Sequence, residues 1–375
     1  MCNAIPPPRQ WQRAGQLHSS GGRYMGESFL DNETWRYFWH PVCTVKELAE
    51  SDKGRGELLC ARLLGTELVI ARLDSGVVAM NNRCPHRSAK LHLGWNRGDS
   101  VQCPYHGWQW GADGSCKGIP AAPDGPIPPN AKAVSYDCAE RYGLVWVRLD
   151  GSAGTAIPEH PVFDDPAFRC VPGPSYDWKT HSARRVENYT DLAHFPFVHP
   201  ETLGSAGHVT FLTPQIAFRK EGRMRFRYAP PEGARNAVDA SGNFSPLAFS
   251  DYTIRLPFGV SVDLTLQNGA RTVLWVWATP LDDIHCRSFW FACRNGDLDG
   301  PDQPHIDQQM RILEEDVDIV ESQDPEQIPH PRDEIAVAPD KVSLTYRRLL
   351  YALCKAKAQG PEALKAFLDT ERDDI

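Results

Sequence analysis

The chain has 375 residues, a net charge of −8 and hydrophobic and charged fractions of 41% and 23%, ordinary values for a soluble globular protein large enough for two domains. The acidic balance argues against nucleic acid as a partner, and no apolar run approaches the length of a membrane span. Eleven scattered cysteines, an odd number, argue against a disulfide framework and indicate a reducing compartment, the cytoplasm.

The first part of the chain predicts a leader and an all-β domain. Residues 1–24 are rich in Pro, Gly, Ser and Gln, so we expect a mobile N-terminal leader. We place the first domain at residues 25–151. It should begin with a short helical turn near Val45 and contain a hairpin that turns at Gly65-Thr66. The strand-like runs of this domain are 58–64, 67–73, 77–80, 108–110 and 142–149.

The second part predicts a larger mixed domain at residues 152–375. Residues 152–175 contain several prolines and little periodicity, which indicates a connector. Helical patterns cover 302–321 and 343–368. Short alternating runs predict one large, twisted antiparallel sheet, and they cover 210–218, 224–228, 252–256, 260–267, 272–279 and 288–294. The fold class is therefore α+β.

The motif with the most chemistry lies in the first domain, where Cys84-x-His86 is followed by Cys103-x-x-His106. Two thiolates and two imidazoles suit either a Cys₂His₂ zinc site or a Rieske [2Fe–2S] cluster. Each cysteine comes just before its histidine, so each loop can give one ligand to each iron. A proline stiffens each loop, and Gly107 lets backbone N–H groups approach the bridging sulfides. These details favour the cluster.

A second metal site is indicated by Asp191-x-x-His194-x-x-x-x-His199. Asp191 and His194 should share a helix face, and Pro196 should break the helix so that both imidazoles converge. Two histidines and one carboxylate on one face of Fe(II) leave positions open for dioxygen. The alternative is a helix end with buried, hydrogen-bonded histidines. A third ligand would come from the acidic run that holds Glu314, Glu315, Asp316, Asp318 and Glu321.

These motifs resemble those of the oxygenase α-subunits of Rieske non-haem iron oxygenases. The resemblance runs from about Trp35 to Leu368. Within the family, the sequence is similar to bacterial caffeine and methylxanthine N-demethylases, and to hydroxylases of saxitoxin-type alkaloids. The stretches that carry the resemblance to the whole family are C-P-H-R-S-A-K-L, C-P-Y-H-G-W, E-N-Y-T-D-L-A-H-F-P-F-V-H-P and E-E-D-V-D-I-V-E-S-Q-D-P. The likeness to the N-demethylases lies in Y-F-W-H-P-V-C-T-V, H-R-S-A-K-L, E-R-Y-G-L-V-W-V-R-L-D, R-R-V-E-N-Y-T-D and D-K-V-S-L-T-Y-R-R.

The resemblance implies an all-β Rieske domain followed by a helix-grip catalytic domain. It implies that Asp316 is the third iron ligand and that Asn188 lies near the iron. It also implies a head-to-tail homotrimer, in which Asp191 links His194 to His106 of the neighbouring chain. Such an oxygenase component takes electrons from NAD(P)H through a separate flavin and iron–sulfur reductase, sometimes through a ferredoxin. With dioxygen it hydroxylates or N-demethylates a small N-heterocyclic substrate.

Three other functions remain open from the sequence. The same metal ligands would serve a dioxygenase that makes cis-diols on an aromatic ring, or an O-demethylase. Outside the enzymes, a Rieske electron carrier with an inactive second site is the competing interpretation, and the complete set of His194, His199 and Asp316 counts against it.

Overall fold

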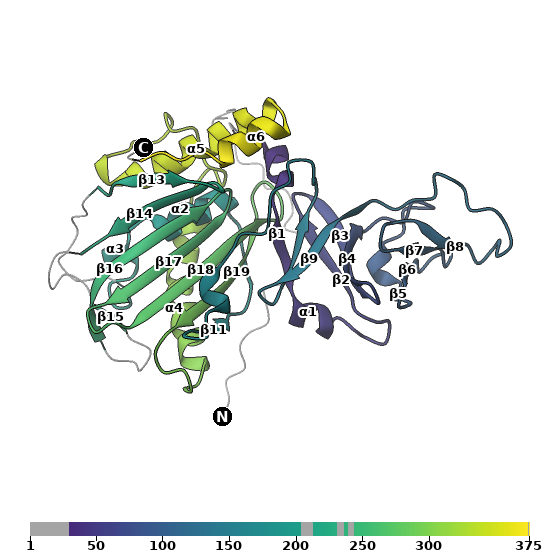
Figure 1. Cartoon of the computed structure of the whole chain (residues 1–375), viewed down its shortest axis with the longest axis horizontal. Coiled ribbons are helices and arrows are strands. Elements are labelled where there is room, and N and C mark those ends of the chain that lie inside the picture. Colours follow the sequence, from purple (N-terminus) through teal and green to yellow (C-terminus); the bar gives the residue numbers. More distant parts are fainter. Residues whose placement is uncertain (1–29, 204–212, 231–235, 239–243, 374) are drawn as a thin grey trace.

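The computed structural model describes residues 30–203, 213–230, 236–238, 244–373 and 375. The predicted leader and part of the predicted strand at 210–218 lie outside this range. Figure 1 shows two lobes side by side, a smaller all-β lobe and a larger lobe in which helices cover a broad sheet. The predicted α+β class is confirmed.

The smaller lobe is built on a six-stranded antiparallel sheet with the order β1-β10-β9-β4-β3-β2. A 3-10 helix, η1 (Asn32–Tyr37), precedes it, and α1 (Val45–Glu50) confirms the predicted helical turn. The hairpin between β2 and β3 turns at Leu64 and Gly65, one residue earlier than predicted, and both have positive φ as a tight hairpin turn requires. The strands are β1 (His40–Thr44), β2 (Leu58–Leu63), β3 (Thr66–Leu73), β4 (Gly76–Asn81), β9 (Ser135–Arg141) and β10 (Leu144–Arg148).

A four-stranded sheet forms the tip of the smaller lobe, at the end that lies farthest from the larger lobe in Figure 1. A short 3-10 helix, η2 (Leu91–Leu93), leads into it. Its strands are β5 (Trp95–Asn96), β6 (Ser100–Gln102), β7 (Gln109–Gly111) and β8 (Cys116–Gly118).

The larger lobe contains the predicted antiparallel sheet, with nine strands. Its path is β11-β19-β18-β17-β16-β14-β13, while β12 pairs with β19 and β15 with β16. In β14 the arginines face outward and Met224, Phe226 and Tyr228 are buried, the alternation of a half-buried strand. The strands are β11 (Arg169–Pro172), β12 (Tyr176–Trp178), β13 (Ile216–Arg219), β14 (Arg223–Tyr228), β15 (Asn236–Val238), β16 (Phe244–Arg255), β17 (Gly259–Leu266), β18 (Arg271–Pro280) and β19 (Cys286–Arg294).

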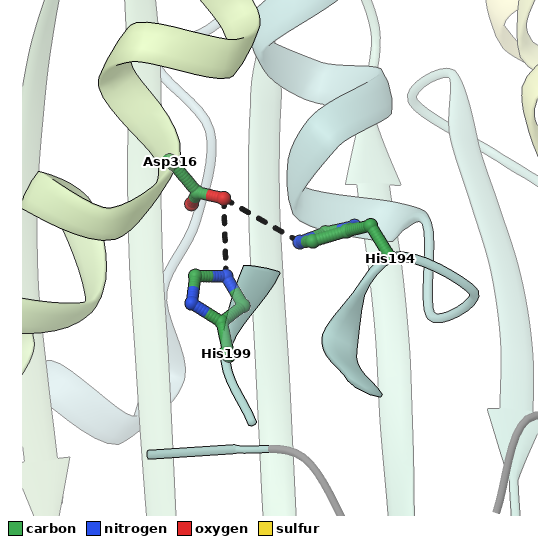
Figure 2. A group of neighbouring side chains, drawn as sticks. All are labelled: His194, His199 and Asp316. Atoms are coloured by element: carbon green, nitrogen blue, oxygen red, sulfur yellow. Dashed lines mark ion pairs between the residues drawn. The ribbon is translucent and has the colours of Figure 1, made fainter. Parts of the chain in front are cut away.

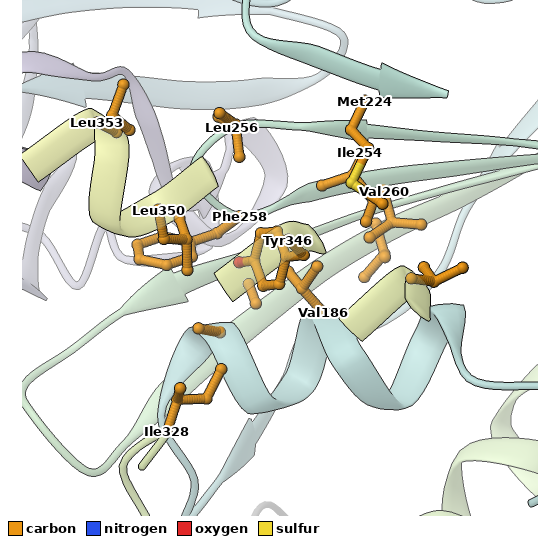
Figure 3. Close-up of a cluster of buried hydrophobic side chains, with 14 of the residues drawn as sticks. Val186, Met224, Ile254, Leu256, Phe258, Val260, Ile328, Tyr346, Leu350 and Leu353 are labelled. Carbon is orange, nitrogen blue, oxygen red and sulfur yellow. The ribbon is translucent and has the colours of Figure 1, made fainter. Parts of the chain in front are cut away.

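Helices pack on this sheet around the main hydrophobic core, which Figure 3 shows between the strands, α2 and α5. The predicted helix at 343–368 is in fact two helices. Gly360, with a φ of +111°, and Pro361 end the first and start the second. The helices are α2 (Ser182–Thr190), α3 (Phe195–Val198), α4 (Gln303–Glu321), α5 (Lys341–Ala358) and α6 (Pro361–Leu368), with 3-10 helices η3 (Pro161–Asp164) and η4 (Ala338–Asp340).

The predicted connector is more ordered than expected. Residues 169–172 form the edge strand β11. This strand pairs with β19 so that Cys170 lies opposite Cys293. These two cysteines form a disulfide, the single one in the described part of the chain. The cysteines were expected to form no disulfide framework, and this one disulfide is the exception. The thiols meet because two strands far apart in sequence pair, which cysteine spacing does not reveal.

The two lobes share buried side chains. Leu30, Trp35 and Phe38 precede the smaller sheet but pack into the core of the larger lobe. Trp146 of β10 packs against Trp277 of β18 with ring centroids 5.6 Å apart. These contacts fix the lobes against each other. Among the described residues, no helix combines the length and hydropathy that a membrane span needs.

Candidate functional site: a cysteine–histidine tip and a buried histidine–carboxylate triad

Two similar loops at the tip of the smaller lobe bring together Cys84, His86, Cys103 and His106. In each loop the backbone N–H of the cysteine donates to the carbonyl five residues later, at Ala89 or Trp108, over 2.8 Å. The residue four after each cysteine has positive φ and donates back to the cysteine carbonyl. Because the loops have the same turn, they present their cysteines in matching positions, whereas His86 lies two residues after its cysteine and His106 lies three residues after its own.

The four side chains are sorted by depth. Cys84 and Cys103 are buried, whereas the imidazoles of His86 and His106 lie nearer the surface with ring centroids 4.7 Å apart. Burial raises the pKa of the Cys84 thiol to about 11, so a metal has to displace its proton. The buried indole Nε1 of Trp110 makes no hydrogen bond. An iron–sulfur cluster suits this site, because its thiolate and sulfide atoms can accept a hydrogen bond from the Trp110 N–H.

The second motif lies where helix α2 ends. The expectation that Asp191 and His194 share a helix face is wrong, because α2 ends at Thr190 and Asp191 is extended with a ψ of 123°. The Asp191 carboxylate accepts a hydrogen bond from the Ala193 N–H, a local turn that competes with the helix. Pro196 does not break a helix either; it lies in the first turn of α3, where no N–H is needed.

Figure 2 shows that His194, His199 and Asp316 still converge, from the α2–α3 turn, the end of α3 and the middle of α4. One oxygen of Asp316 lies 3.0 Å from His199 Nε2 and 3.5 Å from His194 Nε2. One potential ligand atom from each residue lies within 4.8 Å of the others. The buried Nε2 of His194 makes no hydrogen bond, as expected for an atom that coordinates a metal. The donor set therefore fits a ferrous ion bound by two histidines and one carboxylate.

The Nδ1 atoms of both histidines point away from the triad, and each faces a carboxylate. Glu315 accepts hydrogen bonds from His199 Nδ1, over 2.8 Å, and from the Thr202 hydroxyl. Asp191 lies 3.4 Å from His194 Nδ1. Carboxylates in these positions fix the tautomer that leaves Nε2 free for a metal. Glu315, which the sequence offered only as one of several acids, is thus placed to orient His199.

Electrostatics favour a negative Asp316 in this site. Burial alone would raise the pKa of its carboxyl group, but the adjacent imidazoles of His194 and His199 and the charge of Arg185 bring it well below its usual range. Asn188 also donates a hydrogen bond of 3.1 Å to the same carboxylate oxygen. Asn188 therefore lies beside the triad.

The triad separates two cavities of opposite character. The outer cavity, of about 280 Å³, is lined by Asp191 and by charged residues of α2, α5 and the loop before α5. The inner cavity is walled mainly by apolar side chains and also contains the buried amide of Gln309. Its apolar residues are Phe195, Leu203, Tyr252, Val262, Leu264, Leu274, Ile312 and Leu313. A substrate and an electron donor could therefore approach the same ion from different sides.

Comparison with known proteins decides the family. The Rieske [2Fe-2S] domain family matches residues 38–135, and the family described as the vanillate O-demethylase oxygenase C-terminal domain matches residues 178–356. The methylxanthine N3-demethylase NdmB of Pseudomonas putida is 38% identical over 346 residues, covering 90% of this chain and 94% of that protein. The chain belongs to the Rieske non-haem iron oxygenases.

Solved structures of the family agree with this placement. NdmA of Pseudomonas putida CBB5, solved with caffeine, has a TM-score of 0.86 and 38% identity, covering 92% of this chain and 98% of that one. NdmB of the same strain has a TM-score of 0.83 at 38% identity, covering 93% of this chain and 100% of that one. The predicted Rieske domain and large-sheet catalytic domain are thereby confirmed as the fold.

As a member of this family, the chain is the oxygenase component of a Rieske monooxygenase system, with a [2Fe–2S] cluster and a mononuclear non-haem iron. It obtains electrons from NAD(P)H through a separate reductase. A stretch of 121 residues is 38% identical to the oxidoreductase NdmD of Pseudomonas putida and covers 20% of that protein. The zinc alternative and the electron-carrier alternative are thereby set aside.

Proposed function

We propose that this oxygenase component N-demethylates a small N-methylated heterocycle of the methylxanthine type. The observation that carries the proposal is the inner cavity, in which apolar walls and one buried amide lie directly beside the triad. Flat methylated heterocycles combine an apolar face with a few carbonyl and ring-nitrogen groups. The relatives named as methylxanthine N1- and N3-demethylases support this substrate class.

We further propose the roles of the site residues. Cys84, His86, Cys103 and His106 hold the [2Fe–2S] cluster. The mononuclear iron is held by His194, His199 and Asp316, and when bound it supplies the activation of dioxygen. Asn188 and Glu315 keep the ligands in position through Asp316 and His199.

The reaction balances as a monooxygenation. An N–CH₃ group, dioxygen, two electrons and two protons give N–CH₂OH and water. The N–CH₂OH product then breaks its C–N bond and releases formaldehyde and the N–H heterocycle. The protein's own part is to hold the methyl group beside the triad and to exclude water with the apolar walls of the inner cavity.

Gln309 is the group that we assign to substrate orientation. Its side chain is only 7% exposed, lines the inner cavity and has no hydrogen bond to the described part of the chain. An amide can donate and accept at once, which matches the carbonyl and ring-nitrogen groups of a xanthine. A substrate that hydrogen-bonds this amide is favoured over one that buries it without a partner.

Asp191 is proposed to connect the two metal centres between chains of a homotrimer. Its side chain is 41% exposed and opens to the outer cavity, while its other side faces His194 Nδ1. Ile319 and Ile335, 57% and 99% exposed, lie at the same cavity. Exposed apolar side chains bordered by polar and charged groups are typical of a protein docking surface. The tip of a neighbouring chain, with His106, is the proposed partner, and the cytoplasm is the proposed compartment.

The test is product analysis with the purified oxygenase, a surrogate NAD(P)H-dependent reductase and a panel of methylxanthines. Formaldehyde and the demethylated purine should form in equal amounts. Gln309→Leu should raise KM by about 10-fold or more with a smaller effect on formaldehyde per electron pair. A cis-diol as the product, or turnover only of methoxy compounds, would replace this proposal by a dioxygenase or an O-demethylase.

A further inference from the structure

A buried arginine without a partner lies at the junction of the two lobes, away from both metal sites. Arg255 is the last residue of β16 and is 9% exposed. Its Nε is fully buried and makes no hydrogen bond, and the residue forms no ion pair within the part of the chain that the structure describes. A guanidinium stays charged in proteins, so its burial is unfavourable unless an anion compensates it.

Arg255 lines a cavity of about 530 Å³. The walls come from the start of the smaller lobe, the connector, β16, β18 and α6, so both lobes contribute. None of these wall residues lines either cavity beside the iron triad. Clefts between domains are common places for small ligands. Its large apolar wall residues are Phe38, Trp39, Ile157, Leu256, Trp277 and Leu368.

The acidic side chains of this cavity lie at its opening, whereas Arg255 lies deep. The acids Glu159, Glu221 and Asp369 are exposed, so they lie at the rim, and none is within ion-pair distance of Arg255. Two further cations, Arg141 and Lys365, line the same space. The deep end therefore has a positive charge that no carboxylate of the described chain contacts, surrounded by apolar surface.

The neighbouring buried histidine does not change this balance. Burial lowers the pKa of His160 to about 4, and the charge of Arg255 contributes to the same shift. His160 is therefore neutral at physiological pH, and its buried Nε2 also makes no hydrogen bond. Neutral imidazole cannot provide the missing negative charge.

We propose that this cavity binds a small organic anion with an apolar body, such as an aromatic carboxylate. The carboxylate binds the Arg255 guanidinium, and the apolar body contacts the aromatic and leucine side chains of the walls. A planar guanidinium holds a carboxylate with two parallel hydrogen bonds. Because residues of both lobes line the site, the bound anion also ties the lobes together and stabilises the folded protein.

The probe is benzoate, titrated into the holoprotein by calorimetry and by thermal unfolding. Benzoate should bind saturably and raise the unfolding temperature, whereas the uncharged isostere benzamide and sulfate should do neither. Arg255→Leu should weaken benzoate binding about 10- to 100-fold. Arg255→Lys, which keeps the charge but loses the planar fork, should weaken it less.

Arg225→Leu is the matched control, because Arg225 is an exposed arginine on the adjacent strand β14 and does not line the cavity. It should bind benzoate like the wild type. Without ligand, Arg255→Leu should unfold at the same temperature as the wild type or higher, because a buried unpaired charge is removed. Benzoate binding that survives in Arg255→Leu would overturn the proposal. So would no binding to the wild type, or equal binding of sulfate and benzoate.

Discussion

At the scale of single residues, the site depends on a few side chains that have two partners each. His199 offers Nε2 to the triad and donates Nδ1–H to Glu315. His194 offers Nε2 to the triad and turns Nδ1 toward Asp191. The two histidines have the same arrangement, but the Glu315 side chain on α4 is 24% exposed, whereas the Asp191 side chain is 41% exposed and opens to the outer cavity. That difference is why we assign electron entry to Asp191.

The first prediction concerns the third ligand. Asp316→Ala should lower the iron content from about three to about two per chain and abolish turnover, because the carboxylate that faces both imidazoles is removed. The cluster absorbance and electron paramagnetic resonance signal should persist. Asp318→Ala is the control, since Asp318 is exposed on the same helix. Loss of iron in Asp318→Ala but not in Asp316→Ala would show that the ligand is misassigned.

The second prediction concerns Asp191. Asp191→Asn should keep both metal centres, but the amide cannot accept N–H bonds from two imidazoles through one charged group. Electron transfer between the centres should slow by about 10- to 100-fold or more. Stopped-flow reoxidation of pre-reduced protein with substrate and dioxygen measures it, with Asp318→Asn as control. Reoxidation at the wild-type rate would exclude Asp191 as the connection.

At the scale of elements, helix α4 selects the ligand among many acids. Its buried residues Gln309, Leu313, Asp316 and Val320 are spaced by four, three and four, so they form one face. Asp316 lies on this face between two apolar residues, and the other acids do not. This spacing is a signal in the sequence that could have identified both Asp316 and the cavity residue Gln309.

The third prediction concerns β1, which begins at His40 between the two lobes. Its imidazole is fully buried, bonded to the Trp35 carbonyl over 2.9 Å and to the Trp277 indole over 3.3 Å. Burial lowers the pKa of His40 to about 4. Because the folded pKa lies below the unfolded value of about 6.5, the stabilisation is complete above that value and is lost as pH falls toward 4.

Between pH 7.5 and pH 5, His40 alone should cost about 2 kcal/mol of stability. His40→Gln keeps both hydrogen bonds without a titratable group, so its thermal midpoint should fall less over this range than that of the wild type. Calorimetry of the holoprotein at both pH values measures the difference. His330→Gln, at an exposed position, should behave like the wild type. An unchanged pH dependence in His40→Gln would contradict the assignment.

At the scale of the whole molecule, the two metal-binding regions lie in different lobes, with the four-stranded tip pointing away from the nine-stranded sheet (Figure 1). Shared aromatic contacts hold the lobes in this arrangement. In the proposed homotrimer, the tip of one chain would reach the outer cavity of another. Such a homotrimer would be needed for electron transfer, since it would bring the cluster of one chain beside the mononuclear iron of its neighbour.

The fourth prediction tests that assembly. Ile335→Lys should shift the protein from trimer toward monomer and lower turnover, because a fully exposed isoleucine at the outer cavity becomes a charge at the proposed interface. Cluster and iron content should not change. Light scattering at several protein concentrations measures the mass, and Leu298→Lys is an exposed control outside this cavity. A monomeric wild type would contradict the trimer itself.

The sequence by itself determined the local features. Cys84-x-His86, Cys103-x-x-His106 and the pair of His194 and His199 are close in the chain, so short turns are enough to bring their donors together. The alternation of apolar and polar residues also determined the strands of the large sheet, since its two faces have different surroundings.

Only the tertiary structure decided what depends on long-range packing. It brought Asp316 against both imidazoles, placed Glu315 behind His199, and paired Cys170 with Cys293. It also ended α2 before Asp191, because the Asp191 carboxylate accepts a hydrogen bond from the Ala193 N–H, and it enclosed Arg255 between the two lobes.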